Sequence, residues 1–213
     1  LKKKKKIPIL VGGTGLYFKA LVDGLVNIPR IPNKYRNKIR TLHKKIGAKK
    51  FFSKLIQIDP LIKDYITEFD TQRSIRAYEI KLYTKKSMIK WFRDTKPYFD
   101  QKDFFKIYVD LPRNQIINRI NLRTHQMIKN GAIKEVRNFL KLKVPKMKTA
   151  NKAIGILEIR EFLEKKIDEN KLIEKISIKT RQYAKRQSTW GRGKMSDWMK
   201  INPKNSNKFL KKI

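Results

Sequence analysis

IPILVGGTGLYFKALVDGL, at residues 7–25, is the stretch of sequence that decides the fold class. Its apolar run Ile7–Val11 predicts a buried strand, and the segment after Gly15 is apolar and compatible with a helix. A strand, a glycine turn and a helix in this order are typical of α/β proteins, which place ligand-binding groups at the carboxyl end of a strand. The stretch therefore predicts an α/β fold with a first candidate site at Gly12–Gly15.

The chemistry of the Gly12–Gly15 turn suits an anion. Glycines let the backbone approach a ligand closely, and the N–H groups at the start of a helix attract negative charge. Thr14 adds a hydroxyl group at that point. The turn matches neither the phosphate-binding pattern GxxxxGK(S/T) nor the dinucleotide fingerprint GxGxxG. Spacing alone leaves two interpretations open: a ligand-binding turn, or an ordinary turn whose glycines only supply positive φ.

The charge of the chain points to a polyanionic partner. Its 213 residues include 54 lysines and arginines against 18 aspartates and glutamates, which gives a formal net charge of +36. Such a surface attracts nucleic acid, although a coding bias toward lysine, isoleucine and asparagine is another source of the lysines. The lack of cysteine excludes disulfides and thiolate metal sites, and two histidines are too few for a zinc site. No apolar run approaches the roughly 20 residues that span a bilayer, so we expect a cytoplasmic protein with no membrane partner.

Sequence patterns divide the chain into three regions. Residues 1–26 are predicted to belong to the α/β core, and residues 27–103 to be mostly helical and to include an insertion. Residues 104–213 are predicted to complete the core with strands at 104–110 and 195–201, basic helices between them and a basic tail. Strands separated by long helical crossovers predict a parallel sheet.

Two basic helices carry further candidate contacts. Gln72, Arg73 and Arg76 lie within about one helical turn, and arginines at this spacing can clamp a phosphate or contact base edges. The helix at residues 180–187 carries three cationic side chains in two turns, Arg181 among them. A solvated helix face is the alternative interpretation of each arginine pair. The carboxylates form no pair at catalytic spacing, and no metal site is expected among the side chains.

These segments also resemble a known family. GGTGLY at residues 12–17 looks like the GGTxxY turn of the tRNA dimethylallyltransferases, which are also called tRNA isopentenyltransferases. Four further segments resemble the family in its order: TQRSIRAYEI, RINLRTHQMIKNGAIKEVRNFL, NKAIGILEIREFL and TRQYAKRQSTW. The resemblance runs from about Lys6 to Trp198. It implies a P-loop-kinase-like parallel sheet core with a largely helical insertion.

The resemblance implies a reaction and a set of site residues. The family transfers a dimethylallyl group from dimethylallyl diphosphate to the exocyclic amine of the adenosine that follows the anticodon, with Mg²⁺ on the diphosphate. By their match to the family motifs, Gly13, Thr14 and Arg181 would bind the diphosphate, and Thr14 and Arg181 would act in catalysis. The implied contacts with the tRNA anticodon stem-loop are Arg36, Gln72, Arg73, Arg76, Lys152 and Gly155. We expect a monomer.

The sequence departs from the family at its start. The P-loop and the DSxxxY segment that supplies the catalytic aspartate are absent, so we expect an incomplete core without its N-terminal strands and a chain that is inactive by itself. The strand at 7–11 would then either pair with the strand at 104–110 or leave exposed backbone groups. Two alternatives stay open: a tRNA-binding module that has lost catalysis, and an adenylate isopentenyltransferase that acts on a free nucleotide. The basic surface and the tRNA-contact motifs favour tRNA over a free nucleotide.

Overall fold

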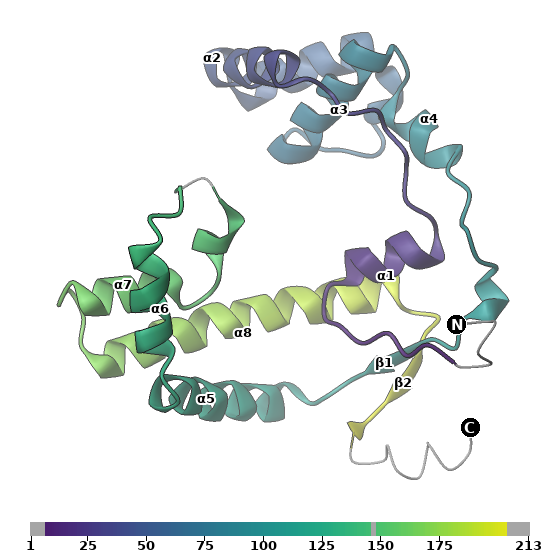
Figure 1. Ribbon diagram of the computed structural model, residues 1–213. Helices are drawn as coiled ribbons and strands as arrows, with labels where there is room; N and C mark the ends of the chain where they lie inside the picture. The colour runs from purple at the N-terminus through teal and green to yellow at the C-terminus, as the bar shows by residue number, and fades with distance from the viewer. Residues whose placement is uncertain (1–6, 146–147, 204–213) are drawn as a thin grey trace. The chain divides into compact units, whose positions relative to one another are not determined.

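The chain forms two compact units in a computed structural model that describes residues 7–145 and 148–203 (Figure 1). The first unit joins Leu1–Gly15 to Phe105–Ile213, and the second unit is Leu16–Phe104. The predicted limits at residues 26 and 103 stay predictions. Most of the predicted basic tail lies outside the described residues.

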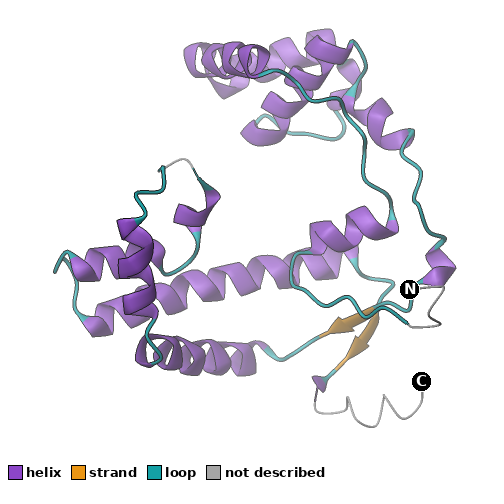
Figure 2. Ribbon diagram, in the orientation of Figure 1, coloured by secondary structure: helices purple, strands orange, loops and turns teal. Residues whose placement is uncertain are grey.

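A small parallel sheet and a layer of helices make up the first unit. Strand β1 (Ile107–Val109) pairs in parallel with β2 (Met199–Ile201), as Figure 2 shows. The helices between them are α5 (Arg113–Lys129), α6 (Ala132–Lys141), η4 (Thr149–Lys152), α7 (Ile156–Leu163) and α8 (Glu169–Lys194). Parallel pairing across a helical crossover agrees with the predicted α/β fold class, although both strands are shorter than predicted.

Local sequence signals place the helices of this unit. Gly131 has a φ of 100°, which lets the chain turn from α5 into α6 at the predicted break. Asp168 caps α8, because its side chain accepts a hydrogen bond of 2.7 Å from the N–H of Lys171. The core lies where α5, α6, α7 and α8 meet, and its buried residues are Ile128, Ala132, Val136, Ile159, Leu172 and Ile176.

The prediction of a buried strand at Ile7–Val11 is wrong. These residues form a loop, and the side chains of Ile7, Ile9 and Val11 are 90%, 84% and 91% exposed. The sheet in the described residues consists of β1 and β2, and this segment pairs with neither strand. A strand needs a neighbouring strand to form hydrogen bonds with its backbone N–H and C=O groups. Without such a neighbour, the backbone groups of residues 7–11 form hydrogen bonds with water instead.

The second unit is helical. Its helices are α1 (Gly15–Val22), α2 (Asn33–Ile58), η2 (Pro60–Ile62), α3 (Thr71–Thr84), α4 (Met88–Arg93) and η3 (Gln101–Asp103). Gly47 interrupts α2 with a φ of 77°, and Asp70 caps α3 by accepting from the N–H of Arg73 at 3.1 Å. The buried core residues are Ile31, Leu55, Ile62, Ile66, Ala77, Ile80, Met88 and Ile89. None of the described helices in either unit is long and apolar enough to cross a membrane.

Candidate functional site

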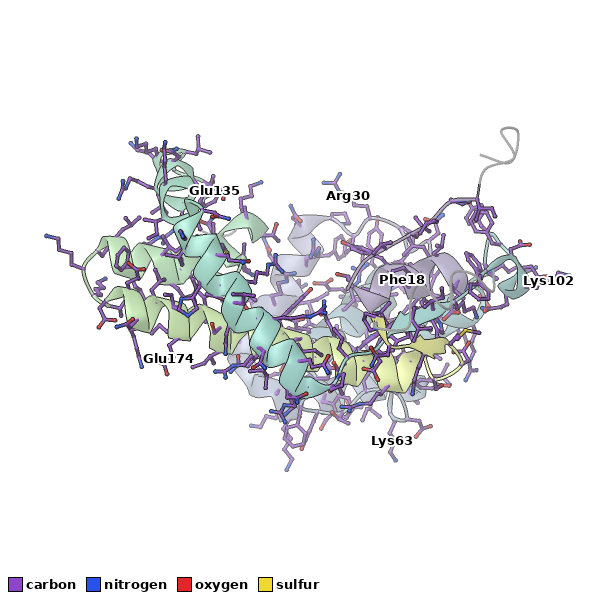
Figure 3. All side chains as sticks on the ribbon, turned by 90° about the horizontal axis from the view of Figure 1, so that it is seen from below. Phe18, Arg30, Lys63, Lys102, Glu135 and Glu174 are labelled. Carbon is purple, nitrogen blue, oxygen red and sulfur yellow. The ribbon has the colours of Figure 1, made fainter. Side chains whose placement is uncertain are left out.

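Basic side chains are spread over the helices of each unit. Arg30, Lys63 and Lys102 are labelled in Figure 3, where the nitrogen tips of many other side chains also reach outward. With 54 cationic and 18 acidic residues in the chain, the positive charges outnumber the negative ones three to one. The partner that such a surface attracts is therefore an extended anion.

Within the second unit, one buried carboxylate gathers three arginines. Glu79 on α3 is 2% exposed, and it forms ion pairs with Arg36 Nε at 3.7 Å, Arg40 Nε at 3.6 Å and Arg76 Nη1 at 3.3 Å. We call these four residues the Glu79 cluster. It brings together Arg36 and Arg76, two of the predicted tRNA contacts, from α2 and α3. Sequence reasoning missed Arg40 and Glu79, although Arg40 lies one turn after Arg36 on the same helix face.

Gln72 and Arg73 stand apart from that cluster. The Arg73 guanidinium pairs at 2.7 Å with Asp70, the capping residue of α3, and the Arg73 side chain is 72% exposed. Gln72 is exposed in the first turn of the same helix. The predicted set Gln72, Arg73 and Arg76 is therefore split between the exposed start of α3 and the Glu79 cluster.

In the first unit, the glycine turn packs closely against α8. A Cβ at Gly13 would overlap the side chain of Gln187, and a Cβ at Gly15 would overlap the Trp190 ring. Neither Gly13 nor Gly15 is among the described glycines with positive φ. The interpretation that they serve only the backbone conformation is therefore wrong: they permit close approach. Thr14 lies between them and is exposed.

Arg181 lies on α8, six residues before Gln187. Helix geometry separates the two by about 9 Å along the axis and about 120° around it. In the part of the chain that the structure describes, no hydrogen bond or ion pair joins Arg181 to Thr14. The turn and Arg181 thus share one supporting helix, and their common role at a diphosphate stays a prediction.

The Lys152–Gly155 turn is held by a second buried carboxylate. Gly155 has a φ of 104°, and its N–H donates to Glu158 Oε2 at 2.8 Å, which is a capping-box contact at the start of α7. Lys179 of α8 forms an ion pair with the other carboxylate oxygen. Burial acts to raise the pKa of Glu158, but the hydrogen bonds from Lys179 and from the Gly155 N–H outweigh it and lower that pKa below its usual value. Lys152 is exposed at the end of η4.

The chain matches proteins of known activity over nearly its whole length. A family model described as IPP transferase matches residues 1–194. A tRNA dimethylallyltransferase from Pelagibacter ubique (strain HTCC1062) is 54% identical over 213 residues, which are 100% of this chain and 68% of the relative. Its counterpart from Agrobacterium fabrum (strain C58 / ATCC 33970) is 38% identical over 205 residues, which are 95% of this chain and 69% of the relative.

Solved structures are similar in fold. The full-length tRNA isopentenylpyrophosphate transferase from Bacillus halodurans superposes with a TM-score of 0.54 at 28% identity, covering 94% of this chain and 61% of that one. A eukaryotic dimethylallyltransferase described as acting on tRNA gives a TM-score of 0.70 at 25% identity, covering 89% of this chain and 48% of that one. The chain therefore spans 68–69% of these two curated relatives and a smaller share of the solved chains.

Proposed function

Because the chain belongs to the IPP transferase family, we propose that it binds the anticodon stem-loop of tRNA and dimethylallyl diphosphate for transfer of the dimethylallyl group. The resemblance seen in five sequence motifs is confirmed by the family model and by relatives that are tRNA dimethylallyltransferases. Modification of tRNA by a prenyl transferase is the function that these relatives support. The acceptor that we propose is the exocyclic amine of the adenosine next to the anticodon.

The observation that carries the tRNA assignment is the Glu79 cluster. The side chains of Arg36, Arg40 and Arg76 are 39%, 50% and 43% exposed, so each is partly open to solvent while its guanidinium faces the same carboxylate. A guanidinium has five N–H donors, and one carboxylate cannot satisfy those of three arginines. The remaining donors suit phosphate oxygens of an RNA backbone. Gln72, Arg73 and the Lys152–Gly155 turn are the further RNA contacts of this proposal.

At the reaction centre, charge builds up on the leaving diphosphate. The amine nitrogen forms a bond to the allylic carbon, the carbon–oxygen bond to the diphosphate breaks, and the amine loses a proton. We assign the backbone at Gly13 and the hydroxyl of Thr14 to hydrogen bonds with the diphosphate, and Arg181 to neutralising its developing charge. Donors fixed before the reaction stabilise such charge without having to reorganise. The adenine has to leave its stack so that its amine can reach the allylic carbon.

Mg²⁺ accompanies the diphosphate in this proposal. The diphosphate oxygens would carry the ion, and we assign no step to it. The chain acts as a monomer on tRNA in the cytoplasm in this proposal.

Binding of a labelled anticodon stem-loop to the 213-residue chain tests the proposal. We expect affinity to fall steeply between 50 and 200 mM salt, as for about six or more phosphate contacts. Arg73→Ala should weaken binding and lower the slope of log K against log salt by about one, while Thr14→Ala should leave affinity unchanged. Binding that ignores salt, or an Arg73→Ala variant that binds as tightly as the unmodified chain, would contradict the assignment.

A competition assay separates the proposal from the free-nucleotide alternative. The stem-loop and adenosine monophosphate are each offered to the chain with dimethylallyl diphosphate present, and bound stem-loop and prenylated product are both measured. The proposal expects that monophosphate in excess leaves the stem-loop bound. Displacement of the stem-loop by the monophosphate, or prenylation of the monophosphate, would favour an adenylate isopentenyltransferase. Because the chain is expected to be inactive by itself, binding of the stem-loop without product is the expected result, whereas prenylated stem-loop would exclude a module that only binds tRNA.

A further inference from the structure

The most unusual polar group of the second unit is the carboxylate of Glu79. It is 2% exposed, yet its atom Oε1 has no hydrogen-bond partner among the described residues, and neither has the buried Nε of Arg36. Arg76 alone reaches hydrogen-bond distance, at 3.3 Å. A buried charge whose hydrogen bonds are incomplete is costly, and a buried ion pair is weak evidence for stability. The group therefore calls for an explanation other than stability.

We propose that Glu79 is a positioning residue that holds Arg36, Arg40 and Arg76 as one phosphate-binding cluster, and that Arg40 is itself a contact to RNA. The inference rests on the tRNA binding proposed above. It adds an acidic residue, whereas all the charged residues among the other proposed RNA contacts are basic. It also adds an arginine that the sequence motifs do not include.

The arrangement of the helices supports this role. Arg36 and Arg40 are four residues apart on α2, so they share one face, and Arg76 faces them from α3. Three guanidiniums around one carboxylate leave a local excess of two positive charges. Without the carboxylate the guanidiniums would repel one another and turn toward solvent in separate directions. With it each keeps a nitrogen within 4 Å of one or the other oxygen of the same carboxylate, with donors left over for an anion.

The direction in which Glu79→Gln changes RNA affinity shows whether Glu79 positions the arginines or only reduces their attraction to phosphate. Glu79→Gln keeps the size of the side chain and raises the net charge of the cluster from +2 to +3. If only charge mattered, the variant would bind RNA more tightly, because attraction to phosphates grows with positive charge. If Glu79 positions the arginines, the variant binds more weakly despite its extra charge.

The experiment measures stem-loop binding of the full chain at several salt concentrations for three variants. We expect Glu79→Gln and Arg40→Ala each to weaken binding by about 3- to 10-fold, and Arg40→Ala to lower the salt slope by about one. Lys38→Ala is the matched control, since Lys38 is an exposed cation between Arg36 and Arg40 on the opposite face of α2. It should change affinity less than 2-fold.

Thermal melts followed by circular dichroism show whether each variant is folded at the assay temperature. Arg40 is half exposed, so Arg40→Ala keeps the inference falsifiable if Glu79→Gln unfolds. A folded Glu79→Gln that binds as tightly as the unmodified chain, or an Arg40→Ala equal to Lys38→Ala, would overturn this inference alone. An unmodified chain that does not bind the stem-loop would overturn the proposed function and this inference with it.

Discussion

Replacing Lys179 with alanine tests how the Lys152–Gly155 turn is held. In the native chain Lys179 on α8 pairs with Glu158 on α7, and the same carboxylate accepts the N–H of Gly155 at 2.8 Å. The Glu158 side chain is 3% exposed, whereas that of Lys179 is 48% exposed. Removing the lysine therefore leaves a buried carboxylate without its counter-ion. Because the lysine is half exposed, its removal opens no buried cavity.

The size of the effect follows from this asymmetry. Removing one partner of a fully buried ion pair costs about 3–5 kcal/mol, and an exposed pair contributes about 0.2–1 kcal/mol. The Glu158–Lys179 pair is buried at one end only, and Glu158 keeps the hydrogen bond from Gly155. We therefore expect Lys179→Ala to lower the free energy of unfolding by about 2 kcal/mol at pH 7.

The stability difference between the unmodified chain and Lys179→Ala should change with pH in a predictable direction. A carboxyl whose pKa is lowered by folding stabilises the protein above its unfolded value of 4.5, and this contribution is lost as the pH falls through the folded value. In Lys179→Ala the hydrogen bond and the charge of Lys179, which both lower the pKa of Glu158, are lost, so that pKa is expected to rise relative to the unmodified chain. The difference in stability between the unmodified chain and the variant should therefore be greatest near pH 7 and shrink below pH 4.5.

Urea unfolding at pH 7 and at pH 3.5, followed by circular dichroism, measures this difference. Lys175→Ala is the control, because Lys175 also joins α8 to α7, through Glu161 at 2.7 Å, with both side chains 37–42% exposed. Lys175→Ala should lower the free energy of unfolding by less than about 1 kcal/mol at either pH. The reasoning is refuted if the two variants cost the same at pH 7, or if the cost of Lys179→Ala does not shrink on acidification.

Two further substitutions test the packing. Gly155→Ala should lower the melting temperature through backbone strain of about 1–3 kcal/mol, because φ is 104° while the nearest atoms to a new Cβ are 4.0 Å away; an unchanged melting temperature would show that the turn relaxes freely. Gly191→Ala should also destabilise the chain, by about 1–3 kcal/mol in urea unfolding, because a Cβ would lie 2.6 Å from the Tyr108 ring. Helix propensity alone predicts the opposite sign at Gly191, a gain of about 1 kcal/mol, so a stabilised variant would contradict the packing argument.

Helix ends can be predicted from the sequence where a few neighbouring residues decide them. Asp70 and Asp168 cap their helices through contacts of only three residues, and Gly47 interrupts a helix through its own φ of 77°. Such features depend on neighbours that are always present in the chain. These helix ends therefore do not depend on how the rest of the molecule packs.

The strand predicted at residues 7–11 failed because it depended on a distant partner. Its apolar pattern is the pattern of a buried strand, but a strand forms only when another backbone supplies hydrogen bonds along its edge. β1 receives those bonds from β2, more than 90 residues later in the chain, as the parallel register of Ile107 with Met199 shows. No pattern within a short segment reveals whether such a partner is in place.

The candidate site shows the same division between local and distant information. Motif resemblance pointed to Arg36, Gln72, Arg73 and Arg76, because each stands at a recognisable spacing. The sequence assigned no role to Glu79, and only the packing of α2 against α3 buries it at 2% exposure with Arg40 beside it. The chain has three cations for every anion, and two of its buried carboxylates contact basic residues or a turn that we assign to RNA binding. Glu79 orders the arginines on one unit, and Glu158 holds the Lys152–Gly155 turn on the other, so these two buried acids mark where the basic surface is organised.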